Sequence, residues 1–159
     1  MRPLTLAAVT SVAALGFCAA VAQAQTPPHQ RPGLWQSDLV QGGRHITSKS
    51  CVDAASEAQL SVFGASLRKT NNCQQHQLSH NPDGSWTYVS TCTFGGQPRT
   101  TRADIGGDFN SSIKMSLRSP PSAPPEMTMT TTWIGPCGPG MKGGDVIMSD
   151  GVKMNVLGH

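Results

Sequence analysis

The sequence predicts a small, mainly antiparallel all-β domain, a sandwich or barrel of about seven strands with one short helix and two disulfides. Three observations support this fold class. Apolar and polar residues alternate with a period of two over much of the chain, as they do in strands that bury one face. Turns that contain Gly and Pro separate the alternating segments. Four cysteines follow the N-terminal apolar stretch, an even number that suits two disulfides.

Residues 1–24 have the three parts of a secretory signal peptide. Arg2 supplies a basic start, an uncharged Ala-rich stretch follows, and small residues precede a cleavage point after Ala24. The stretch is less apolar than the roughly 20 residues that span a bilayer, and Cys18 is expected to leave with it. We therefore predict a periplasmic or secreted bacterial protein with no transmembrane anchor after cleavage and with a flexible start at residues 25–30.

The rest of the chain is expected to form one domain at residues 31–137, followed by a Gly- and Met-containing tail at residues 138–159. This length suits one modest hydrophobic core. The formal net charge of the chain is only +3, and its basic residues are scattered. The sequence therefore argues against a nucleic-acid partner and against a polybasic membrane contact.

The strands follow from alternation and turn residues, taken in chain order. Two strands surround Gly42-Gly43, and a third runs into a Pro- and Gly-containing reversal at residues 81–84. The fourth strand places Trp86, Tyr88, Cys92 and Phe94 on its buried face. The predicted strands are residues 33–40, 44–50, 73–80, 85–94, 99–105, 109–118 and 127–134.

The clearest alternation lies in residues 109–118, after a predicted turn at Gly106-Gly107. One face of this segment carries Phe109, Ile113, Met115 and Leu117, and the other is polar. The Pro-rich residues 119–126 cannot donate a full ladder of hydrogen bonds and are predicted to form a loop.

One segment, residues 52–69, is a candidate helix. Asp53 suits a helix N-cap, and Leu60, Phe63 and Leu67 recur at helical spacing. Gly64 is a candidate stop inside it.

The cysteines that remain after cleavage, Cys51, Cys73, Cys92 and Cys137, contain no C-x-x-C pair. They are therefore expected to form structural disulfides in an oxidising compartment. Three connectivities are open. The hairpin permits Cys73–Cys92 with Cys51–Cys137 if paired residue numbers sum to 165. We prefer the rival, Cys51–Cys73 with Cys92–Cys137.

Together these features resemble a bacterial family of exported proteins called domain of unknown function 3617. The resemblance rests on Arg31-Pro32-Gly33-Leu34-Trp35, on the cysteines around the hairpin and helix, and on a Thr- and Met-rich last strand that ends in Ile134-Gly135-Pro136-Cys137. It spans residues 31–137. The family has no assigned activity or catalytic residues, so the resemblance implies an envelope or periplasmic protein and no particular chemistry.

A soft-metal site is one alternative, because methionine and histidine ligands suit Cu(I). Met127 and Met129 lie on one face of a predicted strand, but that face also carries Trp133 and belongs in the core. His76 and His80 stand about 13 Å apart on a strand, too far to share an ion. The other candidate ligands are Met115, Met141, Met148, Met154, His29, His45 and His159.

A divergent hydrolase is the other alternative. The chain has no G-x-S-x-G motif, and its carboxylates suggest only one pair, Asp104 and Asp108, around the predicted Gly106-Gly107 turn. We predict no enzyme activity, no cofactor and no metal.

A small apolar ligand or an envelope protein is the expected partner of such a domain. If the β fold holds a ligand cavity, Trp35, Trp86, Tyr88 and Trp133 would line it. The other interpretation, which we prefer, is that these aromatic residues fill the core.

Overall fold

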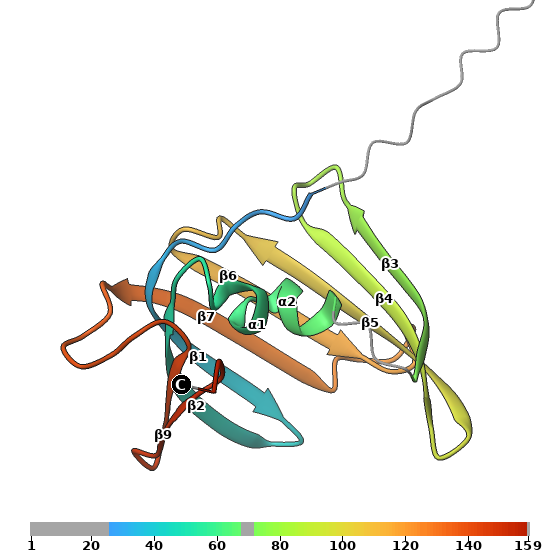
Figure 1. Cartoon of the computed structure of the whole chain (residues 1–159). Helices are drawn as coiled ribbons and strands as arrows, with labels where there is room; N and C mark the ends of the chain where they lie inside the picture. Colours follow the sequence, from blue (N-terminus) through green and yellow to red (C-terminus); the bar gives the residue numbers. More distant parts are fainter. Residues whose placement is uncertain (1–25, 68–71, 159) are drawn as a thin grey trace, which may run out of the picture.

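The computed structural model describes residues 26–67 and 72–158, and in them a mainly antiparallel sheet of nine strands. The strand order is β3-β4-β5-β6-β7-β1-β2-β8-β9. Two short helices lie across one face of this sheet (Figure 1). The strands are β1 Gly33–Gln41, β2 Arg44–Val52, β3 Cys73–His80, β4 Trp86–Phe94, β5 Gln97–Gly107, β6 Ser112–Arg118, β7 Met127–Gly135, β8 Asp145–Met148 and β9 Lys153–Asn155.

The predicted all-β class is confirmed, and each of the seven predicted strands is present. The sheet is open, because β3 and β9 form its two edges, so the fold is one curved sheet covered by helices. The two additional strands, β8 and β9, come from residues 138–159. They extend the sheet because β8 pairs with β2 through Ser48–Met148, Lys49–Ile147 and Ser50–Val146. The predicted signal peptide at residues 1–24, with Cys18, lies outside the described residues, as does His159.

The β3–β4 hairpin has the predicted turn but a different register. His80 pairs with Trp86, so residue numbers sum to 166 and not 165 along most of the ladder. An irregularity between Cys73 and Gln75 then restores the pairing of Cys73 with Cys92. At the turn, the Asn81 amide donates to the Ser85 carbonyl at 2.7 Å.

The observed disulfides are Cys73–Cys92 and Cys51–Cys137, so the connectivity that we preferred from the sequence is wrong. The sheet order explains the observed pairing. Cys51 on β2 is opposite Leu34 on β1, and Leu34 is opposite Gly135 at the end of β7. Cys137 follows Gly135 by two residues, so its Cα lies 5.4 Å from the Cα of Cys51 and the two cysteines form a bridge.

Two predicted details around β6 are also wrong. Phe109 is not on the strand, because it lies in a turn with a left-handed φ of 57° while its ring stays buried. Gly106 and Gly107 belong to β5 and do not form the turn. The Asp108 side chain makes that turn by accepting hydrogen bonds from the amides of residues 110–112.

The predicted helix is present as two pieces, α1 Glu57–Leu60 and α2 Val62–Leu67, which break at Ser61. Gly64 does not stop the helix. It allows a close approach instead, since a Cβ at this position would lie 2.2 Å from the Ala58 carbonyl oxygen.

The core lies between the helices and one face of the sheet, which we call the core face. Phe63 of α2 packs edge-on against Trp86, with ring centroids 5.7 Å apart, and stacks on Phe109 at 5.6 Å. Phe94, which was expected on the core face, is 60% exposed at the end of β4. The buried core residues are Trp35, Val52, Val62, Phe63, Trp86, Tyr88, Ala103, Ile105, Phe109 and Ile113.

Candidate functional site

Trp35, Trp86, Tyr88 and Trp133, the predicted cavity-lining residues, lie in or against the core. Trp35, Trp86 and Tyr88 are only 0%, 6% and 6% exposed. Trp133 is half-buried and packs against the same cluster. Burial also raises the pKa of the Tyr88 phenol.

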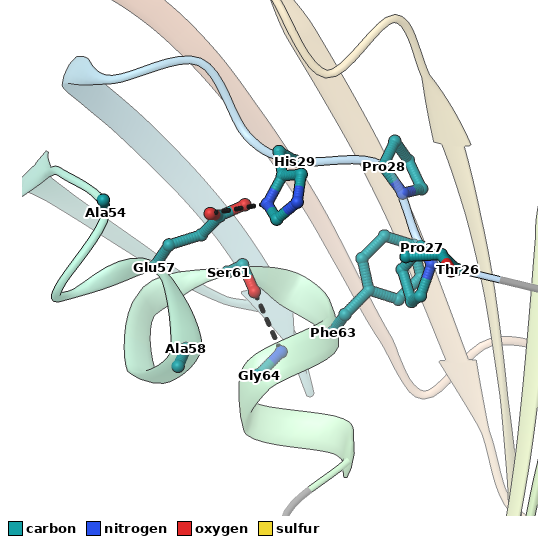
Figure 2. Close-up of a pocket in the computed structure, with 10 residues that line it drawn as sticks. All are labelled: Thr26, Pro27, Pro28, His29, Ala54, Glu57, Ala58, Ser61, Phe63 and Gly64. Carbon is teal, nitrogen blue, oxygen red and sulfur yellow. Dashed lines mark hydrogen bonds and ion pairs between the residues drawn. The ribbon is translucent and has the colours of Figure 1, made fainter.

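A different part of the molecule forms a cleft, between the helices and residues 26–31, which we call the strap. The cleft has a volume of about 510 Å³, within the range of small-molecule sites. Figure 2 shows His29 in direct contact with Glu57 and Phe63 beside the strap prolines. The lining residues are Thr26, Pro27, Pro28, His29, Ala54, Glu57, Ala58, Ser61, Phe63 and Gly64.

The strap is attached to the sheet at its C-terminal end. The Arg31 guanidinium lies over the Trp133 ring, 3.6 Å from its centroid, in a cation–π arrangement. The Trp133 indole donates to the Pro32 carbonyl at 3.1 Å, and the Trp35 indole donates to the Arg31 carbonyl at 2.7 Å. The Trp35 indole therefore holds the last residue of the strap through its backbone, and the Trp133 indole holds the residue that follows it.

Gly33 lets this arrangement form. Its φ is +137°, and a Cβ here would lie 2.3 Å from the Trp133 indole nitrogen. The Arg-Pro-Gly-Leu-Trp segment noted in the sequence thus has a structural role, which is to seat the strap on the last long strand.

Glu57 joins the strap to the helices. Its side-chain carboxylate accepts a hydrogen bond from the Gln30 amide at 2.7 Å and lies 2.9 Å from Nδ1 of His29. Glu57 is largely buried, with 19% of its side chain exposed, whereas the His29 side chain is 85% exposed. The Glu57 carboxylate therefore fixes the position of the strap relative to the helices.

The helical wall is positioned by Asp53, although the N-cap of α1 is Ser56 and not Asp53 as predicted. The Asp53 carboxylate accepts hydrogen bonds from both the amide and the hydroxyl of Ser56, each at 2.8 Å. These bonds lower the pKa of the Asp53 carboxyl. Between α1 and α2, the Ser61 hydroxyl accepts a hydrogen bond from the Gly64 amide at 2.9 Å and defines the start of α2.

Apolar side chains dominate the walls of the cleft, and its polar groups His29 and Glu57 contact each other at one end. Proline rings and an aromatic ring offer rigid apolar surface, and Ala54 and Ala58 leave room beside it. An apolar group with one polar end would fit this arrangement better than an ion, because the Glu57 charge is already satisfied by its two strap partners.

Sequence reasoning missed this cleft because it assigned residues 25–30 to a flexible start. A signal was available in Pro27-Pro28, since consecutive prolines restrict the backbone to an extended form that can cover a surface. The carboxylate that holds the strap lies 27 positions away, at Glu57. No local pattern connects the two.

The other candidate sites are dispersed. Met115 and Met129 are paired across β6 and β7 and pack against the core, and His76 bonds to the Tyr88 hydroxyl. Asp104 forms ion pairs with Arg102 and Arg118 at 2.8 and 3.1 Å. Asp108 instead accepts a hydrogen bond from the Ser111 hydroxyl within its own turn. Among the residues that the structure describes, no three His, Cys, Asp or Glu side chains are grouped as metal ligands. Within the same ranges, neither helix has the length and apolarity to cross a membrane.

The fold and the cleft define a small disulfide-bonded antiparallel β domain with a helical cover. Residues 30–137 match the family described as Protein of unknown function (DUF3617), and the chain belongs to this family. Neither the comparison with curated proteins nor that with solved structures gave a match.

Proposed function

We propose that this protein is an exported, non-catalytic binding domain of the bacterial envelope, and that the cleft holds the apolar part of a small ligand. One observation carries the proposal. The cleft of about 510 Å³ has apolar walls on two separate segments, the strap and the helices, and Glu57 holds those segments in place. A preformed apolar cleft lowers the entropy cost of binding.

The location is supported by the sequence and the disulfides. Two disulfides are compatible with an oxidising compartment, and residues 1–24 have the pattern of a signal peptide. Export makes a direct prediction, which is that N-terminal sequencing of the protein from the periplasm will begin at Gln25.

Native mass spectrometry of protein purified gently from the periplasm tests the binding function. We expect a bound mass on the wild-type chain that is absent from an Ala58→Phe variant, because the new ring would fill the cleft. Ala55→Phe is the matched control, since Ala55 is exposed in the same segment and does not line the cleft. The bare chain mass for all three proteins would contradict the proposal.

A further inference from the structure

A second depression lies on the outer face of the sheet, the face opposite the helices. It has a volume of about 340 Å³ over β5, β6 and β7. Its outward residues form two adjacent rows across the strands. Gly106, Lys114 and Thr130 are cross-strand partners in one row, and Asp104, Ser116 and Thr128 are partners in the next.

Gly106 creates the depression by having no side chain. Its φ is not positive, and an added Cβ would meet only the Ser85 Cβ, at 3.9 Å. Neither the backbone nor the packing therefore requires glycine here. Glycine in a strand interior weakens the strand and often marks a place where a ligand approaches the backbone closely.

The groups around this gap offer both charge and hydroxyls. Lys114, Thr128 and Thr130 are exposed, and their side chains make no hydrogen bond or ion pair with the rest of the described chain. Strand geometry spaces such groups by roughly 4.8 Å across strands and 6.6 Å along them. A free ammonium and two free hydroxyls thus project from neighbouring positions on two adjacent strands.

The surrounding charges favour an anion. The carboxylate of Asp104 is held between Arg102 and Arg118, at 2.8 and 3.1 Å, so its negative charge is compensated locally. Lys114 adds a third positive charge that has no carboxylate partner among residues 26–67 and 72–158. Asp104 and Lys114 are the charged residues that line the depression, and the two arginines beside Asp104 make the surrounding region net positive, which suits a ligand with one negative group.

We propose that the depression over Gly106 binds a sugar acid, with the ligand carboxylate at Lys114, its hydroxyls at Thr128 and Thr130, and its ring over Gly106. Hydroxyl groups serve as donors and acceptors to other hydroxyls, and lysine is a point-charge partner for a carboxylate. This site lies on the face opposite the cleft and does not depend on the function proposed for the cleft.

Amide chemical-shift titration with galacturonate tests this proposal, with galactose, acetate and phosphate as comparison ligands. We expect galacturonate to shift the amides of residues 104–106, 114–116 and 128–130. Galactose lacks the charge, acetate lacks the hydroxyls and phosphate lacks the ring. Each of the three should therefore bind at least tenfold more weakly than galacturonate. Gly106→Val should weaken galacturonate binding at least tenfold, because a β-branched residue suits the strand and fills the gap.

A matched pair keeps the test decisive if Gly106→Val does not fold. Thr130→Val should weaken binding, whereas Thr132→Val, two positions along the same outer face and outside the depression, should leave it unchanged. The proposal is overturned if galacturonate gives no shifts in this region, if acetate or phosphate binds as well, or if Thr130→Val and Thr132→Val behave alike.

Discussion

The side-chain carboxylate of Glu57 accepts a 2.7 Å hydrogen bond from the backbone amide of Gln30. This contact joins the strap to α1, and the adjacent His29 contact at 2.9 Å strengthens the connection. The cleft thus has two walls from distant parts of the chain. Its shape depends on one largely buried carboxylate.

Replacing Glu57 by Ala should loosen the strap. A hydrogen bond to a charged group contributes about 1.5 to 3 kcal/mol, so the Gln30 amide should exchange with solvent at least about tenfold faster in the variant. Amide hydrogen exchange followed by NMR measures this directly. Glu126→Ala is the control, because Glu126 pairs with the exposed Arg99 away from the strap. Unchanged protection of Gln30 would show that Glu57 does not hold the strap.

Gly33→Ala should destabilise the domain. A non-glycine residue with the φ of Gly33 costs on the order of 1–3 kcal/mol, and the new Cβ would also displace the Trp133 indole. Urea denaturation followed by tryptophan fluorescence gives the free energy of unfolding. At Gly42 φ is also positive, but no atom lies within 4 Å, so Gly42→Ala should cost less. If the two variants lost equal free energy of unfolding, the contact with Trp133 would have no part in the requirement for Gly33.

The two disulfides should differ in their contribution to stability. Cys51–Cys137 closes a separation of 86 residues and Cys73–Cys92 one of 19, so the chain-entropy model gives the longer loop roughly 1 kcal/mol more. Paired Cys→Ser variants of each bridge, compared by guanidinium denaturation, measure the difference. Peptide mapping without reduction should recover the two observed pairs, and recovery of a Cys51–Cys73 peptide would contradict the fold.

The C-terminal hairpin should lose stability in acid. Asp145 is buried and binds Lys153, Asn155 and the Lys142 amide, and these contacts hold the pKa of its carboxyl well below the ordinary 3.8. Because the folded-state pKa is lowered, the contribution to stability is complete above about pH 4 and is lost as the pH falls toward the folded-state pKa.

Thermal unfolding of Asp145→Asn and wild-type protein tests this pH dependence. The midpoint difference should be largest near neutral pH and should shrink as the pH falls below about 4. Asp150→Asn, in the exposed turn of the same hairpin, is the control and should show a smaller difference. A wild-type advantage over Asp145→Asn that does not depend on pH would contradict the role of the charge.

The long strands could be predicted from the sequence because each buries one face, which imposes alternation. The sequence allowed a Cys73–Cys92 disulfide but did not favour it over the other connectivities. The pairing depends on an irregularity near Cys73 that offsets the register set by the hairpin turn. Phe109 fits the alternation yet lies in a turn, because Asp108 gathers three amides and lets the ring reach the core.

The features that the sequence did not predict depend on contacts between residues far apart in the chain. Strands β8 and β9 are short and lie among glycines, and they are held by buried Asp145 and by pairing with β2. The cleft requires the strap, Glu57 and the Trp133 contact together. None of these contacts leaves a periodic pattern in the sequence, so only the folded chain shows them.

The most direct test of the account is titration of the neutral apolar fluorophore N-phenyl-1-naphthylamine into wild-type, Ala58→Phe and Ala55→Phe proteins. The cleft is lined by Ala58 and not by Ala55. We predict saturable binding to the wild-type and Ala55→Phe proteins, and binding at least tenfold weaker to Ala58→Phe with its unfolding midpoint preserved. Equal binding to all three proteins, or binding to none, would contradict an apolar binding function for the cleft.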